Sequence, residues 1–416
     1  MKPPLHPRVR SACLVLFCLG ALSIYVARIL RVYLAQRSAV SSQVEGVERA
    51  IRLVPDDAEF PHLLGLLLSA TDQDDGRALA QFRQAVALNP NHARYWLDLA
   101  SVYQVTGDPA KQNEAVRSAL EAEPGNPEVA AEAAQYFLVD GDSNRAFPLF
   151  RQALQQNPEA ANSILPLCWR QTQDAGLLLA QVIPETPQLQ LAFLRMLAEQ
   201  KETAAAATVW KHLIAVRHPF PPQLSFFYFD YLLKQHDVPA FDRDWRELAA
   251  LSPGLQSYLP DENLMVNAGF ELPLLNSGFD WRYGPADHVA AGIDDRIAHS
   301  GSRSLSLSYD GGPAYEAGWA EFVPVLPNAD YEFSAWIKSD NVTTSSGPRI
   351  AIVDAFTGAN LLLTDDLLDT HPWQEIKGSL RVPDGTNLLA VKIVRAPANT
   401  RIRGRVWIDD LRLAKK

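Results

Sequence analysis

Side chains that could perform covalent chemistry are few and scattered along the sequence of 416 residues. Of the three cysteines, Cys13 and Cys18 lie in an apolar N-terminal run, and Cys168 stands alone in a helical stretch. The sequence contains no Cys-x-x-Cys pair and no Cys/His cluster, which argues against a structural zinc site or a disulfide framework. A thiol nucleophile at Cys168 would need a positioned base, so we interpret this residue as a small buried side chain.

Carboxylate pairs and the nine histidines give no stronger indication of catalysis. Asp294-Asp295 and Asp365-Asp366 fall in apparent loops, where solvated acids are the ordinary case. A glycosidase needs two carboxylates about 5–9.5 Å apart across a cleft. The sequence also lacks the Gly-x-Gly-x-x-Gly, phosphate-binding Gly-Lys-Ser/Thr, His-Glu-x-x-His and Gly-x-Ser-x-Gly motifs. We therefore expect a protein that is not an enzyme and has no catalytic residues.

The distribution of charge argues against nucleic-acid binding. The formal net charge is −10, and the apolar fraction of 47% is that of an ordinary globular protein. Residues 1–40 carry six basic side chains and no acidic one, residues 41–259 carry 17 basic and 27 acidic ones, and residues 260–416 carry 15 and 21. Because both large segments are acidic, neither offers the basic face that sequence-independent nucleic-acid binding requires.

Residues 1–40 are predicted to form a membrane signal anchor. The run from Ala12 to Ala27 contains no charge, and apolar residues continue it past Arg28 and Arg31 to Leu34. A bilayer needs roughly 20 residues, and the extended run is long enough because the arginines can reach the headgroups. A cleaved signal peptide is the alternative, although the run lacks a good small-x-small cleavage site. We expect a single-pass protein, in a bacterial inner membrane, with its N-terminus inside and its soluble part exported.

Residues 41–256 contain a repeat of about 34 residues. Proline recurs at the predicted helix ends, at Pro55, Pro90, Pro124 and Pro158, and again at Pro219 and Pro253. Before these prolines, small and apolar residues recur at intervals of three and four, which places them on one helix face. Turn residues separate the helices of a unit, as at Gly107-Asp108-Pro109 and Asp140-Gly141-Asp142.

This spacing resembles the tetratricopeptide repeat, with the clearest units at about 58–92, 93–126 and 127–160. A half unit precedes them, a degenerate pair follows at about 188–220 and 221–255, and residues 161–187 are shorter than a full repeat. The resemblance implies an α-solenoid whose curved surface holds a protein or peptide partner. Four polar residues on first helices could line that surface, and ordinary solvated positions are the alternative interpretation for each. They are Arg94, Gln104, Gln135 and Asp230.

Residues 261–416 are predicted to form an all-β sandwich or jelly roll. Apolar and polar residues alternate over Ser304–Tyr309 and Tyr331–Lys338, and turn residues bound each run. Further predicted strands cover Arg349–Asp354, Gln374–Val382, Leu388–Arg395 and Gly404–Leu413. At least seven short strands in about 155 residues are typical of a sandwich.

The β region resembles a carbohydrate-binding jelly roll of the galactose-binding-like fold, a family often attached to xylanases and related glycosidases. The matching pieces keep the family's order. They are Asn263–Glu271, Trp281, Gly301–Leu305, Tyr331–Ser339 and Val406–Leu413. The resemblance implies a module that binds a polysaccharide or an oligosaccharide, although domains of this shape also bind protein or no ligand.

Two sites follow from this second resemblance. In similar modules a structural Ca²⁺ joins the first strand to the last, which here corresponds to Glu271 and to Asp409 or Asp410. The alternative is that Glu271 caps a turn and Asp409 faces solvent. An aromatic platform would stack on the apolar faces of sugar rings. Its candidates lie near loops or strand ends, and packing in the core or at an edge is the alternative interpretation for each. Trp336 and Trp407 lie inside alternating runs and are predicted to be core. The candidates are Trp281, Tyr283, Trp319 and Trp373.

Together these elements predict a membrane-anchored adaptor, with a protein partner on the solenoid and a glycan on the jelly roll. Such a combination suggests the assembly, export or retention of an exopolysaccharide at a bacterial envelope. Two alternatives stay open: a protein-assembly scaffold whose jelly roll is structural or binds protein, and an accessory to a glycosidase.

Overall fold

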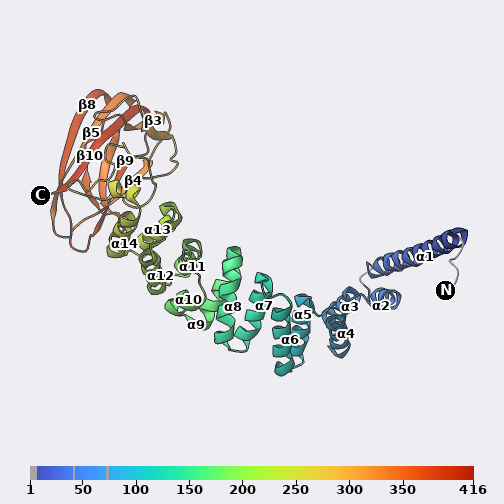
Figure 1. The fold of residues 1–416 in the computed structure, drawn as a ribbon. Helices are drawn as coiled ribbons and strands as arrows, with labels where there is room; N and C mark the ends of the chain where they lie inside the picture. The colour runs from blue at the N-terminus through green and yellow to red at the C-terminus, as the bar shows by residue number, and fades with distance from the viewer. Residues whose placement is uncertain (1–6, 41–42, 72–74) are drawn as a thin grey trace. The chain divides into compact units, whose positions relative to one another are not determined.

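The computed structural model describes residues 7–40, 43–71 and 75–416, so Lys2 of the basic N-terminal segment lies outside the described residues. The chain divides into two compact units, residues 1–185 and 186–416. The first unit is helical, and the second begins with helices and ends in a β sandwich (Figure 1). This is the predicted fold class of an apolar N-terminal helix, an all-α repeat array and an all-β sandwich.

The first unit begins with one long helix, α1 (Pro7–Ala39). Its segment Cys13–Ala39 is long and apolar enough to cross a membrane, a property that an anchor shares with a signal sequence. At 1.5 Å per residue these 27 residues extend about 40 Å, against about 30 Å of bilayer hydrocarbon. The last turns of α1 pack on α2 (Val44–Leu53), where Ala35 and Ala39 are buried.

Antiparallel helix pairs follow in the first unit at the predicted period. The two helices of each pair pack against each other, and each pair packs against the next pair, as the predicted solenoid requires. The last pair is short, in agreement with the shortened repeat expected after residue 160. The helices are α3 (Glu59–Ala70), α4 (Asp75–Leu88), α5 (Ala93–Val105), α6 (Pro109–Ala122), α7 (Pro127–Val139), α8 (Ser143–Gln156), α9 (Ala161–Thr172) and α10 (Ala175–Gln181), with a 3₁₀ turn η1 (Pro158–Ala160) before α9.

Local chemistry fixes the ends of these helices. Gly107 and Gly141 adopt positive φ values of 71° and 78° between the two helices of a repeat, a conformation that glycine adopts without steric cost. The next residue in each turn caps the following helix, since the carboxylate of Asp108 accepts from the N–H of Lys111 and that of Asp142 from the N–H of Arg145. The predicted turns are therefore confirmed.

The second unit begins with two more helix pairs. They match the degenerate repeats expected at about 188–220 and 221–255, and a 3₁₀ segment leads from them into the sandwich. The elements are α11 (Pro187–Glu199), α12 (Thr203–Val216), η2 (Pro222–Ser225), α13 (Phe226–Lys234), α14 (Val238–Leu251) and η3 (Pro253–Tyr258).

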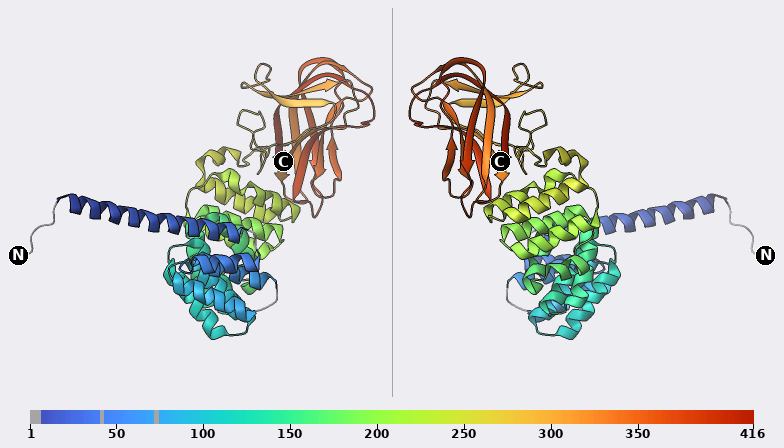
Figure 2. Two further views of the ribbon diagram at one scale, coloured as in Figure 1. Left: turned by 90° about the vertical axis from the view of Figure 1, so that its right-hand side faces the viewer. Right: turned by 90° about the vertical axis from the view of Figure 1, so that its left-hand side faces the viewer.

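Two antiparallel five-stranded sheets form the sandwich and stack as two layers (Figure 2). The first sheet has the order β1-β4-β9-β6-β7, and the second has the order β2-β3-β10-β5-β8. The strands are β1 (Arg282–Tyr283), β2 (Val289–Asp294), β3 (Ser304–Asp310), β4 (Glu316–Pro324), β5 (Asp330–Thr343), β6 (Pro348–Asp354), β7 (Asn360–Leu363), β8 (Asp369–Arg381), β9 (Leu388–Arg395) and β10 (Arg403–Lys415).

The alternation along β5 decides which side chains of the second sheet face outward. Phe333, Ala335 and Ile337 are buried in the core between the sheets. Because successive side chains of a strand point to opposite faces, Ser334 and Trp336 lie on the outer face. The outer face of the second sheet is therefore polar but carries a large aromatic ring.

An aromatic junction joins the last helices to the sandwich within the second unit. The ring of Phe279 packs edge-on against Phe241, with centroids 5.0 Å apart, and lies 6.2 Å from the ring of Trp245 on α14. Trp245 also lies so close to Gly278 that a Cβ on this glycine would be 2.2 Å from the indole. Phe279 and Trp245 are both fully buried. The sandwich therefore closes the apolar end of the helical array.

This junction predicts that unfolding of the sandwich and of the last helices is coupled. Phe279→Ala should lower the free energy of unfolding of this unit by about 3–5 kcal/mol, because it leaves a cavity against Phe241 and Trp245. Urea unfolding of the full chain, followed by tryptophan fluorescence and by circular dichroism, measures the loss. Tyr315→Ala is the control, since Tyr315 is 61% exposed and its removal should change the stability by less than about 0.5 kcal/mol. Equal effects of both variants would contradict the coupling.

Candidate functional site

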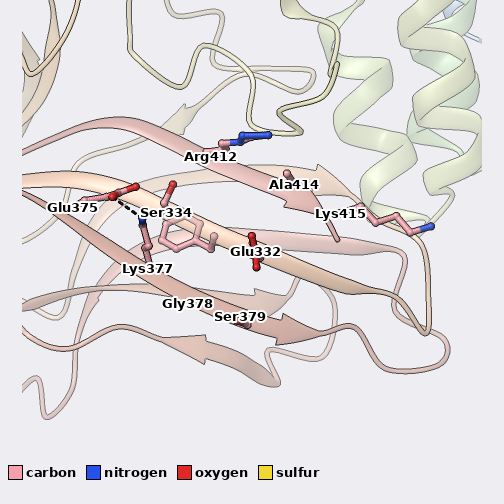
Figure 3. A pocket seen from close by; sticks show the side chains of 10 residues that line it. Glu332, Ser334, Glu375, Lys377, Gly378, Ser379, Arg412, Ala414 and Lys415 are labelled. Carbon is pink, nitrogen blue, oxygen red and sulfur yellow. Dashed lines mark ion pairs between the residues drawn. The ribbon is translucent and has the colours of Figure 1, made fainter.

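A groove of about 620 Å³ lies on the outer face of the second sheet, over β5, β8 and β10 (Figure 3). Ser334 and Glu332 line it from β5, Lys377 and Ser379 from β8, and Arg412 from β10. The register of the sheet places these residues side by side, since Ser334 is opposite both Lys377 and Arg412. The groove is therefore lined by hydroxyl groups and by charges of both signs.

Both carboxylates of the groove are already neutralised by lysines. Glu375 forms an ion pair with Lys377 at 2.8 Å, drawn as the dashed line in Figure 3. Glu332 forms an ion pair with Lys416 at 3.3 Å. Since these acids are exposed to water and paired with lysines, they lack the enclosed cleft that a pair of catalytic carboxylates requires.

An aromatic cluster continues the groove along the same face. Trp336 lies two residues beyond Ser334 on β5, and Trp373 lies two residues before Glu375 on β8. His299 stacks on Trp336 with ring centroids 3.8 Å apart and contacts Trp373 edge-on at 5.7 Å. Both tryptophans are half-buried. Because His299 covers one face of Trp336, Trp373 is the better-placed ring for stacking with a ligand.

The assignment of Trp336 to the core is wrong, whereas Trp407 is buried as predicted but lies outside the core between the sheets. Trp407 is 3% exposed, and its indole N–H donates to the carboxylate of Asp294 at 2.9 Å. Both tryptophans lie on the outer side of the second sheet, but Trp407 is covered and Trp336 is not. Trp336 is thus a site residue that the sequence analysis missed, and the alternation over residues 331–338 contained the signal.

Two of the four predicted platform aromatics cannot stack on a ligand. Trp281 is 0% exposed and Trp319 is 5% exposed, because both pack in the core around Phe270. Their assignment to a glycan platform is therefore wrong. Tyr283 is 43% exposed, but it stacks on Trp319 and lies on β1 of the other sheet. Of the predicted platform, only Trp373 lies beside the groove.

The carboxylates predicted to bind calcium hold down the loop between β2 and β3. Asp409 is buried and accepts from the backbone N–H groups of His299 and Ser300, at 2.7 and 3.2 Å. Burial raises the pKa of Asp409 above its usual value. Asp410 is bonded to the ring of His299 at 2.6 Å and accepts from the hydroxyl of Ser300 at 2.7 Å. These contacts fix the position of the ring that covers Trp336.

Glu271 holds the other end of the same loop. It accepts from the N–H groups of Ser302 and Arg303 at 2.6 and 2.9 Å, and these bonds lower the pKa of its carboxyl group. A Cβ at Gly301 would lie 2.3 Å from this carboxylate, so the loop needs glycine there. Ca²⁺ requires oxygen ligands, whereas N–H and O–H donors of the loop face these acids. In the described part of the chain, no three His, Cys, Asp or Glu side chains converge as metal ligands.

The arrangement of Glu271, Asp409 and Asp410, each bonded to hydrogen-bond donors, does not fit a calcium ion. A bound calcium therefore stays a prediction that rests on the resemblance. We expect that EGTA leaves the midpoint of thermal unfolding unchanged, because protein donors already satisfy the three carboxylates: backbone N–H groups for Glu271 and Asp409, and the His299 ring and the Ser300 hydroxyl for Asp410. Differential scanning calorimetry of the full chain, with 1 mM CaCl₂ added back as the control, measures this. A rise of several degrees on adding calcium would instead support the predicted metal site.

A second polar pocket, of about 430 Å³, lies on the first helices of two neighbouring repeats. Gln104 of α5 lines it together with Glu132, Gln135 and Tyr136 of α7. Arg94 lies beside it, since its guanidinium donates to Glu132 at 2.9 Å. The structure therefore brings three of the four predicted partner-binding residues to one place.

The buried carboxylate of Asp98 holds Arg94 beside this pocket. Asp98 is buried and accepts from Arg94 at 2.5 and 3.0 Å, and His62 lies 2.6 Å from the same carboxylate. Desolvation raises the pKa of Glu132 and raises that of Tyr136 to about 12. Since Arg94 is shared between Asp98 and Glu132, its charge is largely compensated inside the protein.

Asp230, the fourth predicted partner-binding residue, is engaged elsewhere. It forms an ion pair with Arg282 of β1 at 2.5 Å, and the side chain of Arg282 is mostly buried. Asp230 therefore belongs to the junction between α13 and the sandwich, and its assignment to the partner surface is not supported by its position.

Cys168 is a small buried side chain, as predicted from the sequence. Cys168 is fully buried in α9, and burial raises the pKa of its thiol to about 12. At neutral pH this group is a protonated thiol, which is a poor nucleophile.

Comparisons with known proteins concern single parts of the chain. No protein-family model and no curated protein matches the sequence. Among solved structures, the chain is similar to YrrB, described as a TPR protein with an unusual peptide-binding site (15% identity, 51% of this chain, 94% of YrrB, TM-score 0.27). It is also similar to PilF of Pseudomonas aeruginosa (14% identity, 55% of this chain, 93% of PilF, TM-score 0.29). A CBM4 module covers 36% of this chain and 99% of its own length at 14% identity, with a TM-score of 0.28.

Proposed function

We propose that the protein is a non-enzymatic, membrane-anchored adaptor that binds a glycan on its sandwich and a protein segment on its helical array. The observation that carries the proposal is the groove over β5, β8 and β10, with Trp373 at its end. Hydroxyl and charged groups in an open groove can bond sugar hydroxyls, and an aromatic ring beside them can stack on the apolar face of a sugar ring.

The helical pocket supports the second half of the proposal. Amide groups of Gln104 and Gln135 can donate to and accept from the backbone of an extended peptide. Val139 lines the same pocket and is 71% exposed, so it offers an apolar contact to a partner side chain. This combination fits a protein segment better than a small molecule, because the pocket is open and polar.

The apolar helix α1 supports a role at a membrane, and the proposed site of action is a bacterial envelope. A glycan-binding domain on an anchored chain would act in the assembly, export or retention of an exopolysaccharide. A strain that lacks the protein should therefore retain less polysaccharide at its surface. An unchanged amount, chain length and retention of polysaccharide would contradict this role.

A protein-assembly scaffold is the second candidate, and the aromatic junction favours it. Because Phe279 covers the apolar end of the helical array, the sandwich has a structural task even without a ligand. In that case the outer groove would bind protein or remain empty.

Substitution of Trp373 tests the glycan site. Trp373→Ala should weaken binding of a responsive oligosaccharide about tenfold, since a stacked aromatic ring contributes on the order of 1 kcal/mol or more. Isothermal titration of the full chain in detergent, after a screen of polysaccharides, measures the change. Tyr283→Ala is the matched control, because Tyr283 is an exposed aromatic residue on the other sheet. Absence of binding to any glycan by the folded wild-type chain would favour the scaffold.

A further inference from the structure

The groove on the second sheet is basic although its domain is acidic. Residues 260–416 contain 15 basic and 21 acidic side chains. The two carboxylates of the groove are neutralised, however: Glu375 by Lys377 of the groove, and Glu332 by Lys416, which lies outside the lining residues. Arg412 and Lys415 also line the groove, and in the part of the chain that the structure describes neither forms an ion pair. The residues that line the groove therefore include three basic and two acidic side chains, a net charge of +1, and Arg412 lies outside both ion pairs.

Arg412 is placed to hold an anion. It is exposed on β10, where a register shift between Asp409 and Arg412 precedes it, and it lies opposite the hydroxyl-bearing Ser334 of β5. Figure 3 shows Arg412 at the edge of the groove. A guanidinium can donate two parallel hydrogen bonds to one carboxylate, which adds geometric specificity to charge attraction.

We infer that the glycan bound in this groove is acidic, and that Arg412 binds the carboxylate of a uronic acid residue. This inference rests on the proposed glycan-binding function and specifies its ligand class. Trp373 would stack on a neighbouring sugar ring of the same chain, since it lies on the same face beyond Glu375.

An acidic protein segment would satisfy the same charges but not the other features of the groove. Ser334 and Ser379 present hydroxyl groups between the charges, and Trp373 presents a half-buried indole at the end. Alternating hydroxyl groups and apolar ring faces are properties of a polysaccharide. The structure therefore favours a sugar acid over a peptide.

The test compares an oligosaccharide of galacturonic acid with the neutral galactose oligosaccharide of the same linkage and length. Both are titrated into the full chain in detergent at 50 mM and at 500 mM NaCl. The acidic oligosaccharide should bind at least tenfold more tightly at low salt, and the difference should shrink at high salt. Arg412→Gln should remove about tenfold or more of the affinity for the acidic form and leave the affinity for the neutral form unchanged.

Arg296→Gln is the matched control, because Arg296 is a highly exposed arginine in the loop after β2, outside the residues that line the groove. It should leave binding of both oligosaccharides unchanged. Equal affinity for the two forms, with Arg412→Gln silent and Trp373→Ala weakening both, would overturn the acidic ligand and keep the proposed function. Binding of a polyglutamate peptide but of neither oligosaccharide would overturn both.

Discussion

An array of stacked helix pairs leaves an apolar face at its end, and the covering of that face is the constraint on which the second unit depends. Each repeat buries its apolar side against its neighbour, so the last repeat needs another partner. Here Phe279 of the sandwich packs against Phe241 and contacts Trp245 of α14. The same segment continues into β1, where Arg282 pairs with Asp230. One short stretch thus joins the two architectures.

Within the second sheet, the side chains that face the core serve packing, and the alternate side chains on the outer face are available for binding. The inward side chains of β5 fill the core, so the outward ones form a separate surface that the core does not constrain. On this surface the strands supply hydroxyl groups, charges and two indole rings. The loop between β2 and β3 completes the site, since Asp409 and Glu271 hold it where His299 meets Trp336.

Local signals explain how far the sequence analysis reached. The repeat boundaries were predictable because Gly107 and Gly141 mark turns through their own backbone conformation, and the carboxylates after them cap the next helix. Gln104 and Gln135 line one pocket for the same reason, since a fixed period carries a helix face from one repeat to the next, and their role in partner binding stays a prediction. Buried Trp281 and half-buried Trp336 were interchanged because the covering of a ring depends on strands and loops distant in sequence. The pairing of Asp230 with Arg282 spans 52 residues and has no local signal.

The continuity of α1 has a mechanical consequence. Its last turns are packed on α2 through Ala35 and Ala39, and Arg28 forms an ion pair with Asp56, which follows α2. If α1 spans a bilayer, the packing of Ala35 and Ala39 on α2 would couple the span to the first helices of the array. The tilt and rotation of the span would then turn the first helices of the array with it, so the lipid surface would limit the directions in which the helical pocket can face.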